Sequence, residues 1–143
     1  MTIEYWILRD ADITYARWFG HIDTPQLRQN FETYLSDPLY RAGRPELVDL
    51  SGVTSANVDI GGVTMLLNKV NAQDFGTGPG TLTSILATDE NAFGHARQFQ
   101  AMAEMRRGVQ VRISDSESDA LAVLGRPETD LASFLGGQPD YTG

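Results

Sequence analysis

The order in which strand-like and helix-like segments follow one another is the feature that most limits the possible folds of this chain. Two runs of aromatic and branched residues come first, separated by the polar turn Arg9–Asp12, which is typical of a β-hairpin. Segments with a helical repeat of apolar residues then alternate with short apolar runs. The expected strands are 3–8, 13–20, 47–50, 82–87 and 109–113, and the expected helices are 25–35, 59–70, 91–103, 116–124 and a last turn or two within 128–135. This order predicts an α/β fold, with a mixed, mostly parallel sheet of about five strands and about four helices packed on it.

Local signals indicate where the helices begin and end. Thr24 is expected to cap the first helix, with Pro25 at the first helical position. Asp89 or Asn91 is expected to cap the helix over 91–103. Gly125 follows the last strongly periodic segment and is expected to end it.

Length and composition are those of an ordinary globular domain. The chain has 143 residues, of which 41% are hydrophobic and 21% are charged, and this is enough apolar material for one core. We expect a single domain over residues 1–135, followed by a flexible tail over 136–143.

Charge and cysteine content narrow the classes of partner and compartment. The net charge is −8, and the chain has one lysine, Lys69, and one adjacent basic pair, Arg106 and Arg107. Nucleic acids bind proteins by exchanging counterions for Lys and Arg, so we expect no nucleic-acid partner. The N-terminus lacks the pattern of a signal peptide, and no apolar run is long enough to span a membrane. Together with the absence of cysteine, this favours the cytoplasm and no membrane partner.

Two neighbouring segments carry a resemblance to a known family. Residues 48–54 read Val-Asp-Leu-Ser-Gly-Val-Thr, and residues 59–63 read Asp-Ile-Gly-Gly-Val. They resemble the central motif of STAS domains, in which a strand of the form D-L-S-x-V is followed by a loop and by D-S-S-G at a helix start. Residues 120–125, Ala-Leu-Ala-Val-Leu-Gly, are similar to the end of SpoIIAA-like bacterial proteins. The resemblance implies a STAS/SpoIIAA-like fold over about Ile3 to Leu124.

The resemblance also implies a regulatory switch, which this sequence lacks. In anti-sigma-factor antagonists of the family, a partner kinase phosphorylates the second serine of the motif. Asp59 and Gly62 match the family pattern here, but Ile60 and Gly61 stand at the two serine positions. Neither can form a phosphoester, so we expect no serine phosphorylation switch. For the hydroxyls at positions 51, 54, 55 and 64, we expect ordinary loop and capping roles.

The same region supplies the predicted functional surface. We expect a protein partner to bind at the loop and helix start between positions 54 and 62, through Thr54, Ser55, Asn57, Asp59, Gly61 and Gly62. A role as a helix N-cap explains Asp59 without any function, and both roles can hold together. The glycine pair allows either a partner or the sheet to approach the helix closely.

No pattern in the sequence indicates a catalytic, cofactor or metal site. His21 and His95 are the only histidines, and neither has the spacing of a metal-ligand motif. The loop Gly76-Thr-Gly78-Pro-Gly80 follows an expected helix, whereas phosphate-binding loops precede one. Carboxylates fall in expected turns and helix starts, and no serine lies in a G-x-S-x-G turn.

The sequence therefore favours a non-catalytic STAS-like interaction or regulatory module. The alternative is a small-molecule or lipid-binding domain with an apolar pocket between a helix and the sheet. Phe93, Phe99, Met102 and Met105 recur at helical spacing and motivate that alternative, although core packing also explains them. Pairing of two copies through open edge strands is a further possibility.

Overall fold

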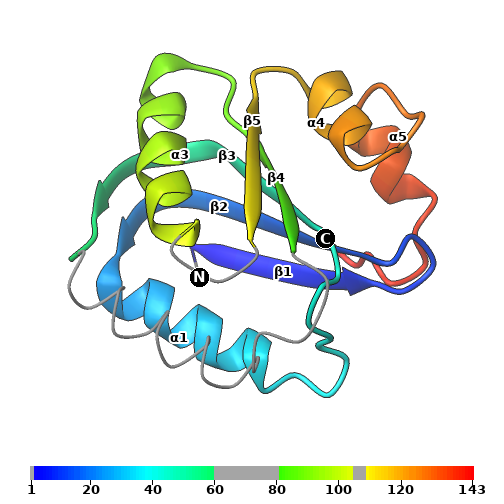
Figure 1. The fold of residues 1–143 in the computed structure, drawn as a ribbon, viewed down its shortest axis with the longest axis horizontal. Helices are drawn as coiled ribbons and strands as arrows, with labels where there is room; N and C mark the ends of the chain where they lie inside the picture. Colours follow the sequence, from blue (N-terminus) through cyan, green and yellow to red (C-terminus); the bar gives the residue numbers. More distant parts are fainter. Residues whose placement is uncertain (1, 60–80, 105–108) are drawn as a thin grey trace.

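The computed structural model describes residues 2–59, 81–104 and 109–143, without the side chains of Met102 and Ala103. Along the chain, the elements are β1 (Ile3–Leu8), β2 (Ile13–Asp23), α1 (Thr24–Leu35), β3 (Glu46–Asn57), β4 (Leu82–Leu86), α3 (Glu90–Ala103), β5 (Gln110–Ser114), α4 (Glu117–Val123) and α5 (Leu131–Gly136). The five strands form one sheet in the order β1-β2-β3-β4-β5 (Figure 1). The β1–β2 pair is antiparallel and the other three pairs are parallel. The predicted α/β class and mixed sheet are confirmed; the helix expected over 59–70 and the loop 75–80 lie outside the described residues.

Helices cover both faces of this sheet, because alternate side chains of the strands point to opposite sides. On one face, buried strand residues such as Val48 and Ile85 pack against α1 and α3. On the other face, Leu47 and Leu86 pack against α4 and α5. In the view of Figure 1, α1 and α3 lie towards the left end of the sheet, and α4 and α5 lie towards the right end. No helix in the described ranges is long and apolar enough to cross a membrane.

The start of α1 differs by one residue from the prediction. Asp23, not Thr24, is the N-cap, and its carboxylate accepts a hydrogen bond from the Gln26 backbone at 2.9 Å. The Gln26 side chain bonds back to the Asp23 amide, which completes a capping box. Because Thr24 does not cap the helix, its side chain makes a different contact. Its Oγ1 accepts a hydrogen bond from the backbone N–H of Asp59 at 2.6 Å.

The start of α3 agrees with one of the two predicted caps. The Asp89 side chain accepts from the backbone N–H of Ala92 at 2.7 Å, as an N-cap does. Asn91 lies inside the helix, and its side chain points back to β3, where it donates to the carbonyls of Val53 and Thr54. Asn91 is therefore not a cap, and its side chain connects α3 to β3 by hydrogen bonds.

The segment after α5 packs back onto the first strand. Asp140 accepts hydrogen bonds from the backbone and the guanidinium of Arg9. The ring of Tyr141 lies edge-on to Trp6, with 4.9 Å between ring centroids. The indole Nε1 of Trp6 donates to Thr142 at 3.1 Å. These contacts locate the tail, and the expected flexibility of residues 136–143 remains a prediction about its motion.

Candidate functional site

The predicted partner-binding residues lie at the far end of β3, and their local structure differs from the prediction. The apolar run 47–50 predicts a strand of four residues followed by a loop, but β3 continues to Asn57. The reason is pairing with β2, which itself runs on to Asp23. Hydrogen bonds to the backbone of a neighbouring strand hold a polar segment in a strand without burying its side chains. The pattern of apolar residues within one segment does not show whether such a neighbour is present.

The two strand ends form a ribbon that extends beyond the rest of the sheet. We call residues 19–23 of β2 and 52–57 of β3 the β2–β3 ribbon. β3 pairs with β4 only from Glu46 to Asp49, so its later residues pair with β2 alone. Figure 1 shows the end of β3 curving away from β4 and β5.

Four of the six predicted residues are exposed on or next to this ribbon. Thr54, Ser55, Asn57 and Asp59 are all exposed. The pairing register passes from Val53 to Ser55 and leaves out Thr54, as at a β-bulge. Gly61 and Gly62, like the proposed capping of a helix by Asp59, fall outside the described residues.

Side-chain contacts fix the ribbon to its surroundings. The Nδ1 of His21 lies 2.7 Å from the Ser55 hydroxyl, directly across the strand pair. At its end the ribbon is tied to α1 through Asp59 and Thr24. On the other side, Asn91 connects it to α3. The surface is thus held in shape by both neighbouring helices.

Close packing at the base of the ribbon requires a glycine. A Cβ built on Gly52 would lie 2.9 Å from the Cβ of Phe19. No larger residue fits without movement of one strand, so Gly52 lets β3 pass beside Phe19. The family-like segment 48–54 therefore contains a residue with a clear structural role.

The ionisable groups with clearly shifted pKa values belong to ion pairs, to core contacts or, at Asp130, to a helix N-cap. The Arg9 guanidinium lowers the pKa of Asp140 to about 2. Burial, followed by the hydrogen bond to Asp37, raises the pKa of Tyr5 to about 12. Within the described ranges, no three His, Cys, Asp or Glu side chains are grouped as metal ligands.

Two small cavities lie between helices and the first face of the sheet, where the alternative prediction expects a pocket. Their volumes are about 30 and 40 Å³, and both are lined by Trp18 and Phe99. The indole N–H of Trp18 is buried and has no hydrogen-bond partner among the described residues. Ligand pockets usually measure roughly 300–1,000 Å³, so each cavity is far smaller than the pocket that the alternative prediction expects.

Of the two phenylalanines on which the predicted pocket was based, one lies in the core and the other on the surface. Phe99 packs edge-on against Trp18, with ring centroids 5.1 Å apart. Phe93 is instead exposed, and the guanidinium of Arg97 lies 5.9 Å from its ring centre. The side chain of Met102 and all of Met105 are outside the described residues.

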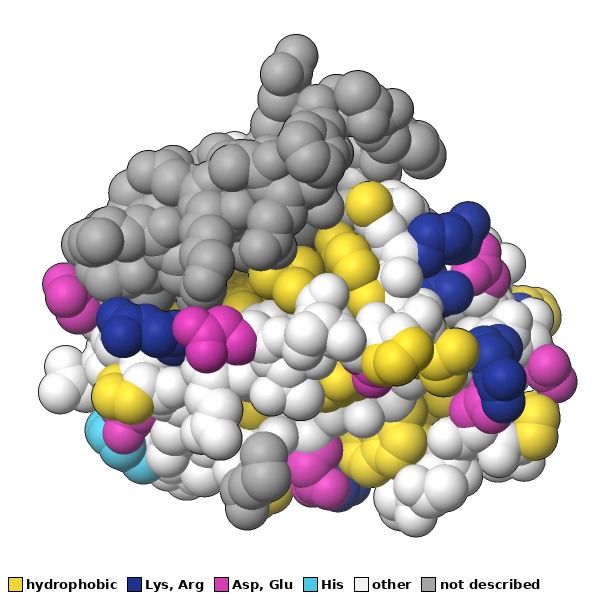
Figure 2. All heavy atoms as spheres, turned by 90° about the horizontal axis from the view of Figure 1, so that it is seen from below, with side chains coloured by type: hydrophobic (Ala, Val, Ile, Leu, Met, Phe, Trp, Pro, Cys, Tyr) yellow, Lys and Arg dark blue, Asp and Glu magenta, His cyan; other side chains and the backbone are white. Residues whose placement is uncertain are grey.

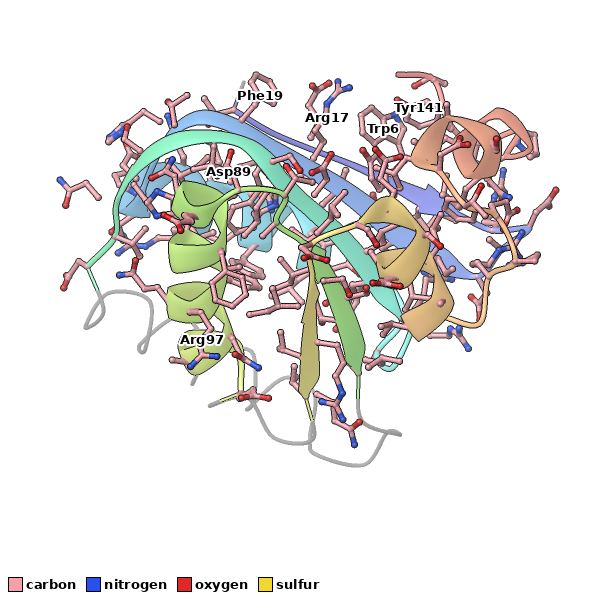
Figure 3. The ribbon with its side chains drawn as sticks, turned by 90° about the horizontal axis from the view of Figure 1, so that it is seen from above. Trp6, Arg17, Phe19, Asp89, Arg97 and Tyr141 are labelled. Atoms are coloured by element: carbon pink, nitrogen blue, oxygen red, sulfur yellow. The ribbon has the colours of Figure 1, made fainter. Side chains whose placement is uncertain are left out.

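Sequence reasoning did not single out a row of side chains on the second face of the sheet. Figure 3 shows Phe19, Arg17, Trp6 and Tyr141 along one side of the molecule. The Arg17 guanidinium lies 5.6 Å from the Trp6 ring centre and 5.9 Å from that of Phe19, and it forms a 2.9 Å ion pair with Glu4. The alternation of residues 13–19 places Arg17 and Phe19 on one face, but their contact with Trp6 depends on the hairpin register.

Comparison with families and curated proteins does not assign the chain to a family. A scan against protein-family models gave no match, and a search of curated proteins gave none either. The residues themselves therefore carry the functional argument.

Proposed function

We propose that this chain is a non-catalytic, STAS-like interaction module that binds a protein partner through the β2–β3 ribbon. The observation that carries the proposal is the exposure of Thr54, Ser55, Asn57 and Asp59 on one segment that extends beyond the sheet. The resemblance of residues 48–54 and 59–63 to the STAS motif supports the same location. Because Ile60 and Gly61 stand at the two serine positions of the D-S-S-G part of the motif, the proposed interaction does not depend on phosphorylation there.

The chemistry of the ribbon supports a protein partner. The exposed side chains on and next to it are two hydroxyls, an imidazole, an amide and a carboxylate, which recognise polar groups by hydrogen bonding: Thr54, Ser55, His21, Asn57 and Asp59. Charges elsewhere do not form a basic surface on the face shown in Figure 2, where arginine side chains lie beside acidic ones. This charge distribution, with the net charge of −8, disfavours a nucleic-acid partner.

Capture of partners from the cell extract tests the proposal with two matched substitutions. Asp59→Arg reverses a charge at the ribbon, whereas Asp115→Arg makes the same change at an exposed site between β5 and α4. We expect one specific partner to be retained by the wild type and by Asp115→Arg, and to be lost with Asp59→Arg or Asn57→Arg. Equal retention by all four proteins would contradict a binding role for the ribbon.

The second candidate is a small apolar ligand between the helices and the sheet, favoured by the unpartnered indole N–H of Trp18. Such a ligand requires the two cavities to join, and Phe99 lines both of them. Native mass spectrometry of freshly purified protein tests it. A bound mass that is lost with Trp18→Phe would support this candidate, and only the bare chain mass would contradict it.

A further inference from the structure

The outer side of β1 presents backbone groups that are free to pair. The carbonyl of Thr2 accepts from the backbone N–H of Phe19 at 2.8 Å, so Thr2 faces β2. Backbone direction alternates along a strand, so Glu4, Trp6 and Leu8 also face β2. The N–H and C=O groups of the other three residues, Ile3, Tyr5 and Ile7, face away from the sheet. No strand in the described part of the chain pairs with that side.

A groove follows this edge, with a volume of about 790 Å³. Residues 2–6 form its floor. On one side stand polar, uncharged side chains of α1, among them Gln29, Asn30 and Thr33. On the other side lie Trp6, Phe19 and Thr142. We call this feature the β1 groove.

The two walls and the floor match the needs of one extended chain segment. Main-chain groups at the floor would pair with the backbone of the segment, as in strand addition to a sheet edge. Side chains of an extended segment alternate between its two faces. One set would meet the polar wall of α1, and the other would meet the rings of Trp6 and Phe19.

Charge favours a basic segment over a second copy of this chain. Glu4 is the one charged residue lining the groove within the described ranges, and it is paired with Arg17 at 2.9 Å, so the groove itself is close to neutral. The charge that bears on a partner is the net charge of −8 of the whole chain. Two copies of the chain therefore repel each other, whereas lysine or arginine in a partner is attracted. If β1 of a second copy paired at this edge, the α1 of that copy would also come to the groove, because α1 contacts β1 in each copy.

We propose that the β1 groove binds an extended, positively charged segment of a partner protein, which adds a sixth strand beside β1. The β1 groove shares Phe19 with the base of the β2–β3 ribbon, but none of the exposed residues Thr54, Ser55, Asn57 and Asp59 lines it. The inference therefore does not depend on the function proposed for the ribbon. Recognition would come from main-chain hydrogen bonds along β1, with the aromatic and polar walls selecting alternate side chains.

Amide hydrogen exchange followed by NMR tests the proposal on the full chain. The probe is the peptide Ac-Lys-Val-Lys-Phe-Lys-Val-NH₂, and Ac-Glu-Val-Glu-Phe-Glu-Val-NH₂ serves as its acidic counterpart. We expect the basic peptide to slow exchange at Ile3, Tyr5 and Ile7, and the acidic peptide to have a smaller effect. Absence of added protection at these three amides up to the solubility limit of the basic peptide would overturn the proposal.

A matched pair of substitutions locates the binding. Gln29→Lys adds a positive charge to the groove wall, and Gln110→Lys makes the same change at the exposed start of β5. We expect Gln29→Lys to weaken binding of the basic peptide about threefold, the size of an exposed charge interaction, and Gln110→Lys to leave it unchanged. Equal effects of both would contradict the location. Protection that rises with protein concentration in the absence of peptide would assign the edge to a second copy and overturn the proposal.

Discussion

The two outer strands of the sheet are protected in different ways. β5 is short and carries the exposed residues Gln110 and Arg112. Its outward carbonyl at Val111 already accepts hydrogen bonds from the side chains of Gln100 and Arg112, at 3.3 and 3.2 Å. Helices α3 and α4 contact β5 from its two faces. Charged side chains, short length and covered backbone are the common means by which proteins prevent unwanted strand pairing.

β1 lacks most of these protections. Its sequence, Ile-Glu-Tyr-Trp-Ile-Leu, is aromatic and branched, and its one charge, Glu4, is paired with Arg17. These six residues pair with β2 on one side only, and a strand of this kind with one unpaired edge is a template for pairing with another chain. Near its end, Asp140 bonds the backbone of Arg9, but Ile3, Tyr5 and Ile7 have no such cover among the described residues. Among the described residues, the chain's own side chains cover the outward backbone at Val111 of β5, whereas Ile3, Tyr5 and Ile7 of β1 have no such cover.

The largest expected effect concerns what holds β1 in place. The Tyr5 ring packs edge-on against Tyr34, with centroids 5.1 Å apart, and its hydroxyl donates to Asp37 at 2.8 Å. We expect Tyr5→Ala to lower the free energy of unfolding by about 3 kcal/mol. Tyr5→Phe should cost about 1 kcal/mol, since only the hydrogen bond is lost. Urea denaturation measures both, and a loss below about 1 kcal/mol for Tyr5→Ala would show that β1 is not anchored through this ring.

A second effect concerns the tail that borders the β1 groove. Deletion of residues 138–143 removes the ion pair of Asp140 with Arg9 and the contact of Tyr141 with Trp6. We expect the free energy of unfolding to fall by about 1–2 kcal/mol, mainly from the lost aromatic contact. Tyr141→Ala, which keeps the rest of the tail, should account for most of this loss. An unchanged melting temperature would favour the flexible tail that the sequence predicts.

A smaller effect would remove the protection of β5. The double substitution Gln100→Ala and Arg112→Ala frees the carbonyl of Val111. We expect little change in stability, within about 1 kcal/mol, but more self-association in sedimentation velocity at high protein concentration. If association does not rise, short length and helix cover alone are enough to protect this edge.

The smallest effect is a dependence on pH. Arg9 lowers the pKa of Asp140 from 3.8 to about 2 in the folded chain. The carboxylate therefore stabilises the fold above about pH 4, and this contribution is lost as the pH falls towards 2. We expect the melting temperature of Asp140→Asn to fall less than that of the wild type between about pH 4 and pH 2, as measured by thermal melts at several pH values. Identical acid profiles of wild type and variant would show that the ion pair does not contribute.

Much of the fold follows from local patterns, whereas the surfaces do not. β1, β4 and β5 are predicted because strand patterns and their flanking turns are local in the sequence. The second half of β3 was missed because its polar residues are held by pairing with β2, a partner more than 30 residues away in the chain. Asp23 was missed as a cap because Thr24 next to it has an equally suitable side chain.

The two candidate surfaces differ in the same way. The four exposed residues of the ribbon lie close together in the sequence, so a motif could indicate them. The β1 groove combines residues 2–6 with Gln29 and Thr33 of α1 and with Thr142 near the other end of the sequence. No local signal relates these segments, and only the packing of α1 and the tail around β1 brings them together.

The central claim is that β1 keeps an open pairing edge, and amide hydrogen exchange in the free protein tests it most directly. We predict that the amides of Glu4, Trp6 and Leu8 exchange slowly, because they face β2, and that those of Ile3, Tyr5 and Ile7 exchange much faster. The alternation should hold over a range of low protein concentrations. Slow exchange at all six amides, independent of concentration, would mean that the chain covers this edge itself and would contradict the account.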